Sequence, residues 1–314
     1  MKKFLVHLHI FYEDMYSEFK QYLINLGAQD NYDLFVSMVK PCLNIENDLK
    51  INFPNAKLFI VENKGYDIAP FVEVLKKVDL DNYEYVIKLH TKRDVKVDAL
   101  PKHLLGCNWR DSLTKFISTK EIFDNVVNTM DHDKHIGMNS DSSIIFSNIC
   151  DYAEEKAQFY NFLKSYNFKV MPYKFVAGSM FIARSCVFKD LQKLSLGSND
   201  FEAPDLSKNT FQTAHAVERL FGYLVSLNNL KLVDCNNQSI IDFKYLKHVL
   251  SFKFKIFSNV FNNEYLPKLR LIKVLLWDDL FCKYIVSVRK TKKNKILIKL
   301  FRIPIYSYKL KEKN

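Results

Sequence analysis

The sequence has 314 residues, of which 48% are hydrophobic and 14% aromatic, so the chain can bury a large core and long disordered stretches are excluded. Residues 244–314 hold 18 Lys and Arg against four acids, a net of +14, whereas the whole chain is only +11 and residues 1–243 sum to −3. We therefore divide the chain into a main domain, 1–243, and a basic amphipathic segment, 244–314, which we expect to be mainly helical.

The first 90 residues alternate between strand-like and helix-like segments. Expected strands lie at 4–11, 33–39, 57–61 and 83–89, and expected helices at 14–26 and 68–78. Dense apolar runs such as 4–11 are typical of strands that are covered on both faces. Strands separated by helix-length segments predict an α/β fold with a mostly parallel, Rossmann-like central sheet flanked by helices.

The rest of the main domain carries weaker patterns. Residues 104–170 are expected to be mainly helical, with short strands at 136–138 and 143–146. A strand at 175–184 is interrupted by small residues, and 209–225 has the apolar spacing of a helix.

No targeting, membrane-spanning or metal-binding pattern is visible. Two histidines interrupt the first apolar run, which argues against a signal peptide, and no run approaches the roughly 18–20 apolar residues of a membrane span. The six cysteines lack metal-ligand spacing and suit a reduced, cytoplasmic protein, so we expect no metal site.

Polar residues directly follow the third expected strand. In parallel sheets ligands bind outside the carboxyl ends of the strands, which directs attention to Asn63, Gly65 and Asp67. Gly65 would let the backbone approach a ligand closely, and Asp67 would accept hydrogen bonds from a base or ribose. The alternative is a strand-to-helix turn in which Asp67 caps the helix.

Cationic residues follow the fourth expected strand. His90, Lys92 and Arg93 gather positive charge that only Asp94 can offset locally, and a diphosphate would be a suitable counter-ion. The alternative is a solvated loop.

Two further pairs are weaker candidates for a ligand pocket. Trp109 and Arg110 combine a stacking surface with an anion contact, although a core tryptophan beside a surface arginine explains them equally well. Gly178 and Ser179 leave room near the backbone, or else form a bulge.

His215 and Glu218 lie three residues apart on an expected helix and share one of its faces. Glu218 could act as a general base, with His215 orienting it or a substrate hydroxyl. The alternative is an ordinary charged helix surface.

Taken together and in order, the segments 63–71, 88–92, 109–110, 177–181 and 215–219 resemble the rhamnan synthesis F family of bacterial glycosyltransferases. The resemblance covers roughly residues 1–240 and implies a GT-A-like fold. In that fold the strand at 83–89 should end in a metal-holding Asp-x-Asp, but His90, Thr91 and Lys92 stand there instead. We therefore expect a metal-independent enzyme that needs no cofactor, with Mg²⁺ or Mn²⁺ as the alternative.

The resemblance also implies roles for the candidate residues. Lys92, with Arg93 or His90, would hold the diphosphate of a nucleotide-sugar donor, dTDP-rhamnose or a UDP-hexose, and Asp67 would lie near the nucleoside. Glu218 would be the base of an inverting transfer to a glycan or glycolipid acceptor, and a retaining transferase is the alternative.

The basic segment, 244–314, alternates Lys and Arg with Phe, Leu and Ile, which suits the headgroup layer of an anionic membrane. We expect a cytoplasmic protein that is peripheral on the inner face of the bacterial inner membrane. A helical subdomain packed on the main domain is the alternative. A nucleic-acid partner is not expected, because no such module appears. A non-catalytic scaffold of a polysaccharide-assembly complex is the remaining class.

Overall fold

The structure is a computed structural model that describes residues 2–93, 109–147, 153–205 and 211–236, together with three strands at 286–290, 295–300 and 303–309. The chain forms two compact units, Met1–Leu246 and Lys247–Asn314, and each is described by itself.

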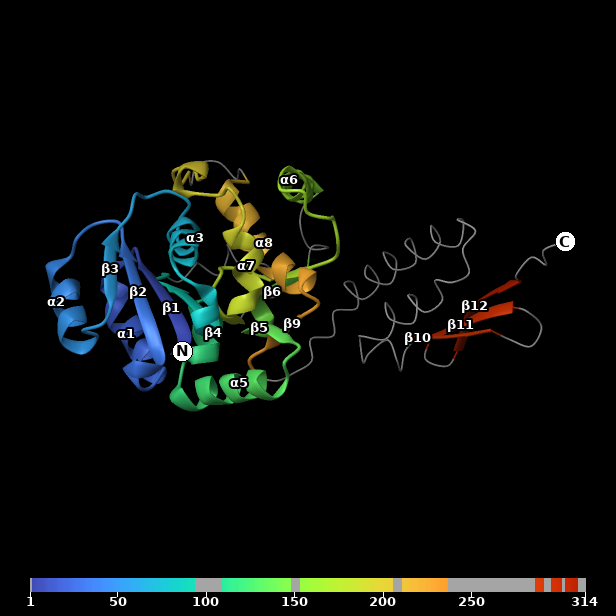
Figure 1. Ribbon diagram of the computed structural model, residues 1–314, viewed down its shortest axis with the longest axis horizontal. Helices are drawn as coiled ribbons and strands as arrows, with labels where there is room; N and C mark the ends of the chain where they lie inside the picture. The colour runs from blue at the N-terminus through green and yellow to red at the C-terminus, as the bar shows by residue number, and fades with distance from the viewer. Residues whose placement is uncertain are drawn as a thin grey trace. The chain divides into compact units, whose positions relative to one another are not determined.

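A seven-stranded sheet forms the centre of the first unit (Figure 1). Its order is β3-β2-β1-β4-β8-β5-β9, and β8 alone runs antiparallel to its neighbours. The expected α/β class and mostly parallel sheet are confirmed. The strands are β1 (Lys2–Ile10), β2 (Tyr32–Met38), β3 (Lys57–Ile60), β4 (Tyr83–His90), β5 (Ile136–Ser140), β8 (Phe181–Arg184) and β9 (Lys231–Asp234).

Helices cover both faces of this sheet. Phe4 of β1 lies 5.5 Å, between ring centroids, from Phe123 of α5, whereas the ring of His7 in the same strand stacks at 5.7 Å on Phe71 of α3. Because neighbouring side chains of a strand point to opposite faces, α5 and α3 cover opposite faces. The helices described are α1 (Tyr16–Asn25), α2 (Leu43–Asn52), α3 (Ile68–Lys77), α4 (Trp109–Thr114), α5 (Lys120–His132), α6 (Ala153–Ser165), α7 (Lys189–Gln192) and α8 (Thr213–Leu227).

The chain changes direction across the sheet at β1. It passes from β1 to β2 and β3 on one side, and then returns to place β4 on the other side of β1. The carboxyl ends of β1 and β4 therefore border a topological switch point, the place where open α/β sheets bind their ligands.

One expected strand of the first unit differs in the structure. The apolar run at 175–184 is two strands, because the turn at Gly178 and Ser179 separates β7 (Lys174–Val176) from β8. β7 pairs with β6 (Ile145–Ser147) in a small antiparallel sheet outside the central one.

The second unit is described through β10 (Val286–Lys290), β11 (Lys295–Leu300) and β12 (Ile303–Lys309), which form an antiparallel sheet in that order. These residues are strands instead of the expected helices. The rest of the expected segment, 244–285 included, lies outside the described residues.

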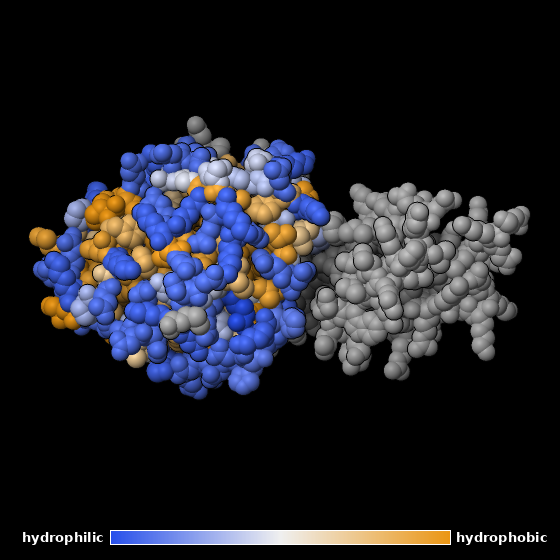
Figure 2. Space-filling view, in the orientation of Figure 1, coloured by the Kyte–Doolittle hydropathy of each residue, from blue (hydrophilic) through white to orange (hydrophobic). Residues whose placement is uncertain are grey.

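The surface of the first unit is mostly hydrophilic in the view of Figure 2. Leu43 and Ile51 of α2 are among its exposed large hydrophobic side chains. Among the helices that the structure describes, none is long and apolar enough to cross a membrane.

Candidate functional site

The carboxyl ends of β1 and β4 are joined by a hydroxyl group. Thr91, the first residue after β4, accepts hydrogen bonds on Oγ1 from the backbone N–H groups of Phe11 and Tyr12, at 2.9 and 2.8 Å. Its own N–H donates to the carbonyl of His9 at 2.9 Å. These bonds fix the backbone on both sides of the switch point.

A buried cluster of charged residues lies just inside this edge of the sheet, at Lys88 near the end of β4. Lys88 of β4 is fully buried, and its ammonium group donates to Asp67 Oδ2 and, over 2.8 Å, to Ser179 Oγ. Ser179 Oγ in turn donates to Asp67 Oδ2 over 2.7 Å. Burial alone would raise the pKa of Asp67, but the adjacent His90 and Lys88 hold this pKa well below its usual range. Asp67 is therefore an ionised carboxylate, held in place before helix α3 by partners from β4 and from the turn at Ser179.

Burial also lowers the pKa of Lys88 from its ordinary value, against the opposing effect of the Asp67 carboxylate. Ion pairs of this kind cost desolvation, so they persist where their geometry serves a site or fixes the packing. The role expected for Asp67 at the nucleoside now has a constraint, because one of its oxygens already serves Lys88 and Ser179. Its other oxygen, Oδ1, lies 3.6 Å from His90 Nδ1.

The backbone of Gly178 connects β4 to helix α8. Its carbonyl oxygen lies 2.9 Å from His90 Nε2, and its N–H donates to Glu218 Oε1 over 2.7 Å. Gly178 has φ +79°, and an added Cβ would lie 2.5 Å from Leu113 Cδ2, so glycine is required there. Ser179 continues the turn with φ 53°, where its side chain reaches Lys88.

Glu218 is partly buried beside this turn. Burial raises the pKa of its carboxyl group above the ordinary value, although Arg219 and the Gly178 N–H act in the other direction. A carboxylate with a raised pKa is suited to accept a proton. The structure thus brings Glu218 close to the turn at Gly178 and Ser179, and through Gly178 to His90.

His215 does not contact Glu218 in this arrangement. Its Nδ1 accepts the backbone N–H of Gln212 at 3.0 Å, which caps the first turn of α8. Burial lowers the pKa of His215, consistent with a neutral ring that accepts a hydrogen bond. Tyr66 lies beside it, with ring centroids 6.0 Å apart, and donates its hydroxyl proton to Gln212 Oε1.

Lys92 and Arg93 differ in what they contact. Arg93 is exposed, pairs with Asp14 at 2.9 Å and lies over the ring of Tyr12 at 4.7 Å. Lys92 is partly buried, and within the described part of the chain its ammonium group has no acidic partner. Lys92 is therefore the freer cation at the end of β4.

The residues before α3 occupy different environments. Asn63 is exposed, whereas Gly65 is buried at φ +60° and donates its N–H to the carbonyl of Glu202 over 2.9 Å. A Cβ on Gly65 would lie 2.5 Å from the ring of Phe201. Close packing in the fold accounts for this glycine.

Trp109 and Arg110 also lie in different environments. Trp109 is partly buried, close to the Gly178 backbone, and its indole N–H is buried without a hydrogen-bond partner among the described residues. Arg110 extends away from the turn, and its Nε lies 3.2 Å from Glu18 Oε1 of α1. Trp109 thus lies at the site, and Arg110 ties α4 to α1.

Several residues of this site did not emerge from the sequence. His7 and His9 are buried on the same face as Lys88, and both rings contact Ser37 Oγ, at 2.8 and 2.9 Å. Burial lowers the pKa of His9 to about 4 and that of His7 well below its ordinary value. Polar residues within buried apolar strands, such as His7, His9 and Lys88, are the signal that could have identified them.

A protein-family model described as rhamnan synthesis protein F matches residues 1–230. The chain belongs to the rhamnan synthesis protein F family. The match covers every residue of the site described above, and the resemblance seen in the sequence is confirmed.

The chain is also similar to curated proteins and to solved structures at low identity. WxcX of Xanthomonas campestris pv. campestris is 24% identical over 224 residues in each of two strains, which is 70% of this chain and 31% of the relative. The chain thus spans about a third of the length of these curated relatives. Among solved structures, TarS 1–349 of S. aureus superposes with a TM-score of 0.41 at 12% identity, covering 76% of this chain and 59% of TarS. A cytidylyltransferase from Leptospira borgpetersenii serovar Hardjo-bovis gives 0.35 at 9% identity, covering 74% and 76%.

Proposed function

We propose that this chain is a glycosyltransferase of bacterial polysaccharide synthesis, which moves a sugar from a nucleotide-diphosphate donor to a glycan or glycolipid acceptor. The observation that carries the proposal is the match of the rhamnan synthesis protein F model to residues 1–230. Support comes from the position of Lys92 and Glu218 at the carboxyl edge of a mostly parallel sheet, where such folds bind ligands.

The donor binds at the switch point between β1 and β4 in this proposal. Lys92 holds the diphosphate, because its ammonium group has no acidic partner among the described residues, and the backbone beside it is fixed by Thr91. Arg93 contributes less, since it is already paired with Asp14. Cations at the end of β4 stand in for the charge of a metal ion, so donor binding is metal-independent in this account.

Glu218 acts as the general base of an inverting transfer. It takes the proton from the acceptor hydroxyl as that oxygen attacks the anomeric carbon and the nucleoside diphosphate leaves. The hydrogen bond from the Gly178 N–H fixes Oε1, which leaves Oε2 to accept the proton. His215 supports this indirectly, by capping the helix that carries Glu218.

Residues 244–314 bring the enzyme to an anionic membrane surface that holds a lipid-linked acceptor. The charge of this segment, 18 Lys and Arg against four acids, supports the assignment. Co-sedimentation of the full chain with anionic vesicles at low salt, and its loss at high salt, is the expected result. No pelleting at low salt would contradict it.

The donor site is tested by thermal unfolding of the full chain with UDP, dTDP, GDP, CMP or ADP. A ligand present at about 100 times its Kd stabilises a protein by roughly 2.7 kcal/mol, which is a readily measured shift. Each shift is compared with the same protein without nucleotide, in EDTA and without it. We expect one nucleoside diphosphate to stabilise the chain, by the same amount with EDTA as without it. No shift with any nucleotide would favour the non-catalytic scaffold, and a shift restored only by Mg²⁺ or Mn²⁺ would contradict metal-independent binding.

A further inference from the structure

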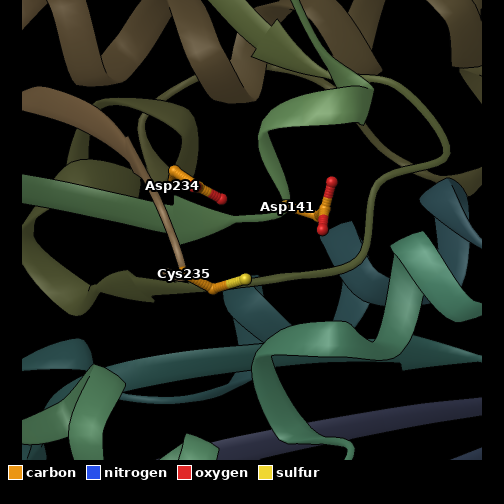
Figure 3. Close-up of side chains that lie close together, drawn as sticks. All are labelled: Asp141, Asp234 and Cys235. Carbon is orange, nitrogen blue, oxygen red and sulfur yellow. The ribbon is translucent and has the colours of Figure 1, made fainter. Parts of the chain in front are cut away.

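Three potential ligands for a metal ion meet at the carboxyl ends of β5 and β9. Asp141 directly follows β5, Asp234 ends β9 and Cys235 follows it, and one ligand atom of each lies within 4.8 Å of the others. All three residues are buried, and Figure 3 shows the side chains of Asp234 and Cys235 extending toward Asp141. This cluster is separated from β4 and the candidate donor site by β8.

The parallel pairing of β5 with β9 holds the cluster together. Ser140 is in register with Asp234, and the N–H of Cys235 donates to the carbonyl of Ser140 over 2.8 Å. The backbone N–H of Ser142 donates to Asp234 Oδ1 at 3.0 Å, and that of Ser143 to Asp141 Oδ1 at 2.7 Å. Both carboxylates are therefore oriented by backbone donors, as the ligands of metal sites commonly are.

The second carboxylate oxygen of Asp234 is buried without a hydrogen-bond partner among the described residues. Asp234 is 0% exposed, and its Oδ2 has no hydrogen-bond partner in the part of the chain that the structure describes. A buried carboxylate oxygen that lacks a partner costs free energy, and a cation is one of the few groups that can compensate for it.

The local charge agrees with a divalent ion. Lys115 is the cation that faces the cluster, with its Nζ 2.9 Å from Asp141 Oδ2. Once Cys235 has lost its thiol proton, two carboxylates, one thiolate and this ammonium group sum to −2, so a divalent cation brings the group to neutrality.

From these observations we propose that Asp141, Asp234 and Cys235 bind a divalent cation of the Zn²⁺ type, with water completing its coordination. A thiolate together with carboxylates suits Zn²⁺ better than Mg²⁺ or Ca²⁺, which prefer oxygen ligands alone. Tetrahedral Zn²⁺ with bonds of about 2.0–2.3 Å separates its ligand atoms by about 3.5 Å, so the side chains close by about 1 Å on binding. The ion fastens the end of β5 to the end of β9.

A surface pocket gives access to the cluster from the side of α5. Its volume is about 620 Å³, and Cys235 lines it together with Asn125 and Thr129. A hydrated ion can enter by this route, and the thiol proton leaves to solvent as the Zn–S bond forms.

The test measures metal binding by the full chain without nucleotide, so its outcome is independent of the donor site. Protein stripped with EDTA is titrated with Zn²⁺ by calorimetry, and with Co²⁺ as an absorbing probe. We expect one Zn²⁺ per chain, and a thiolate-to-cobalt charge-transfer band. Absence of both would overturn the proposal.

Variants assign the site. Cys235→Ser should abolish the charge-transfer band, and Asp234→Asn should weaken Zn²⁺ binding by about 100-fold or more, since loss of a supporting partner alone costs about 10–100-fold. Lys115→Met should tighten binding, because its ammonium group competes for Asp141 Oδ2. A merely structural role for these residues predicts no such gain.

Matched controls separate this site from the other thiols. Cys42 and Cys186 are free cysteines elsewhere in the fold, and their serine variants should keep the band. A chain in which Cys235 is the only cysteine should keep it as well. Loss of the band in that chain, or its retention in Cys235→Ser, would overturn the proposal even if Asp234→Asn failed to fold.

Discussion

The backbone N–H of Gly178 donates a 2.7 Å hydrogen bond to Oε1 of Glu218. The carbonyl oxygen of the same glycine lies 2.9 Å from His90 Nε2 at the end of β4, so the backbone of one residue couples the strand that ends at the switch point to the helix that carries the acid. This coupling places a carboxylate of raised pKa close to His90 at the end of β4, on the side of the sheet where the proposed transfer occurs.

The pH dependence of turnover reports on Glu218. Burial raises the pKa of this carboxyl, and the base must be ionised, so activity should fall as the pH drops through a value above the ordinary glutamate pKa of about 4.3. The measurement is kcat/KM for nucleotide-sugar turnover against pH. An acid limb at or below the ordinary value would contradict the assignment. Glu121→Gln changes an exposed residue on α5 and should leave the pH at which kcat/KM falls unchanged.

Lys92 and Arg93 should contribute unequally to donor binding. Lys92→Met removes a cation without an acidic partner and should weaken binding of the stabilising nucleotide by about 10–100-fold, the value of a charge-assisted hydrogen bond. Arg93→Met should have a smaller effect, since that guanidinium is paired with Asp14. Calorimetric titration measures both. Equal losses, or a larger loss at Arg93, would contradict the account.

The buried pair of Lys88 and Asp67 should dominate local stability. Asp67→Asn leaves the Lys88 ammonium group buried without its counter-charge, and should lower the free energy of unfolding by roughly 3 kcal/mol or more. Asp14→Asn removes the partner of the exposed Arg93. It should change the free energy of unfolding little, because exposed ion pairs contribute little to stability. Urea unfolding followed by circular dichroism compares the two. A similar effect of both changes would show that burial of the pair is unimportant.

Histidine burial predicts a loss of stability in mild acid. Burial lowers the pKa of His9 from 6.5 to about 4, so the unfolded chain binds more protons between these values and stability falls as the pH decreases through that window. The contribution of His9 is up to roughly 3 kcal/mol, from about 1.4 kcal/mol for each pH unit.

The difference in unfolding free energy between pH 7 and pH 4.5 measures this effect. It should be smaller in His9→Asn, which cannot titrate in this window, and unchanged in His135→Asn on the surface. An unchanged difference in His9→Asn would contradict the prediction.

The sequence predicted the sheet well where the strands are continuous apolar runs. β1, β2 and β4 lie within about one or two residues of the expected bounds, because both faces of these strands are buried. Helix α2 was not expected, because Leu43 and Ile51 are exposed in it and only Ile45 and Leu49 face the core. β8 could not be assigned as antiparallel, since pairing with β4 is a long-range choice that no local pattern records.

The site was predicted less completely than the sheet. Glu218, Gly178 and Ser179 lie near His90, whereas the sequence offered them only as separate candidates. His215 was expected to orient Glu218 or a substrate hydroxyl. Since α8 begins at Thr213, this histidine falls in the first turn, and its Nδ1 accepts the backbone N–H of Gln212. Asp141 and Cys235 come together only through the pairing of β5 with β9, which the spacing of residues in the chain cannot reveal.

The most direct test of the proposed function is release of nucleotide from a panel of nucleotide sugars by the full chain and by its Glu218→Gln variant. We predict that the wild-type chain turns over one class of donor, slowly without acceptor, and that Glu218→Gln lowers this rate by about 100-fold or more while binding the nucleotide normally. Turnover of no donor by the wild-type chain, or an undiminished rate in the variant, would contradict the account.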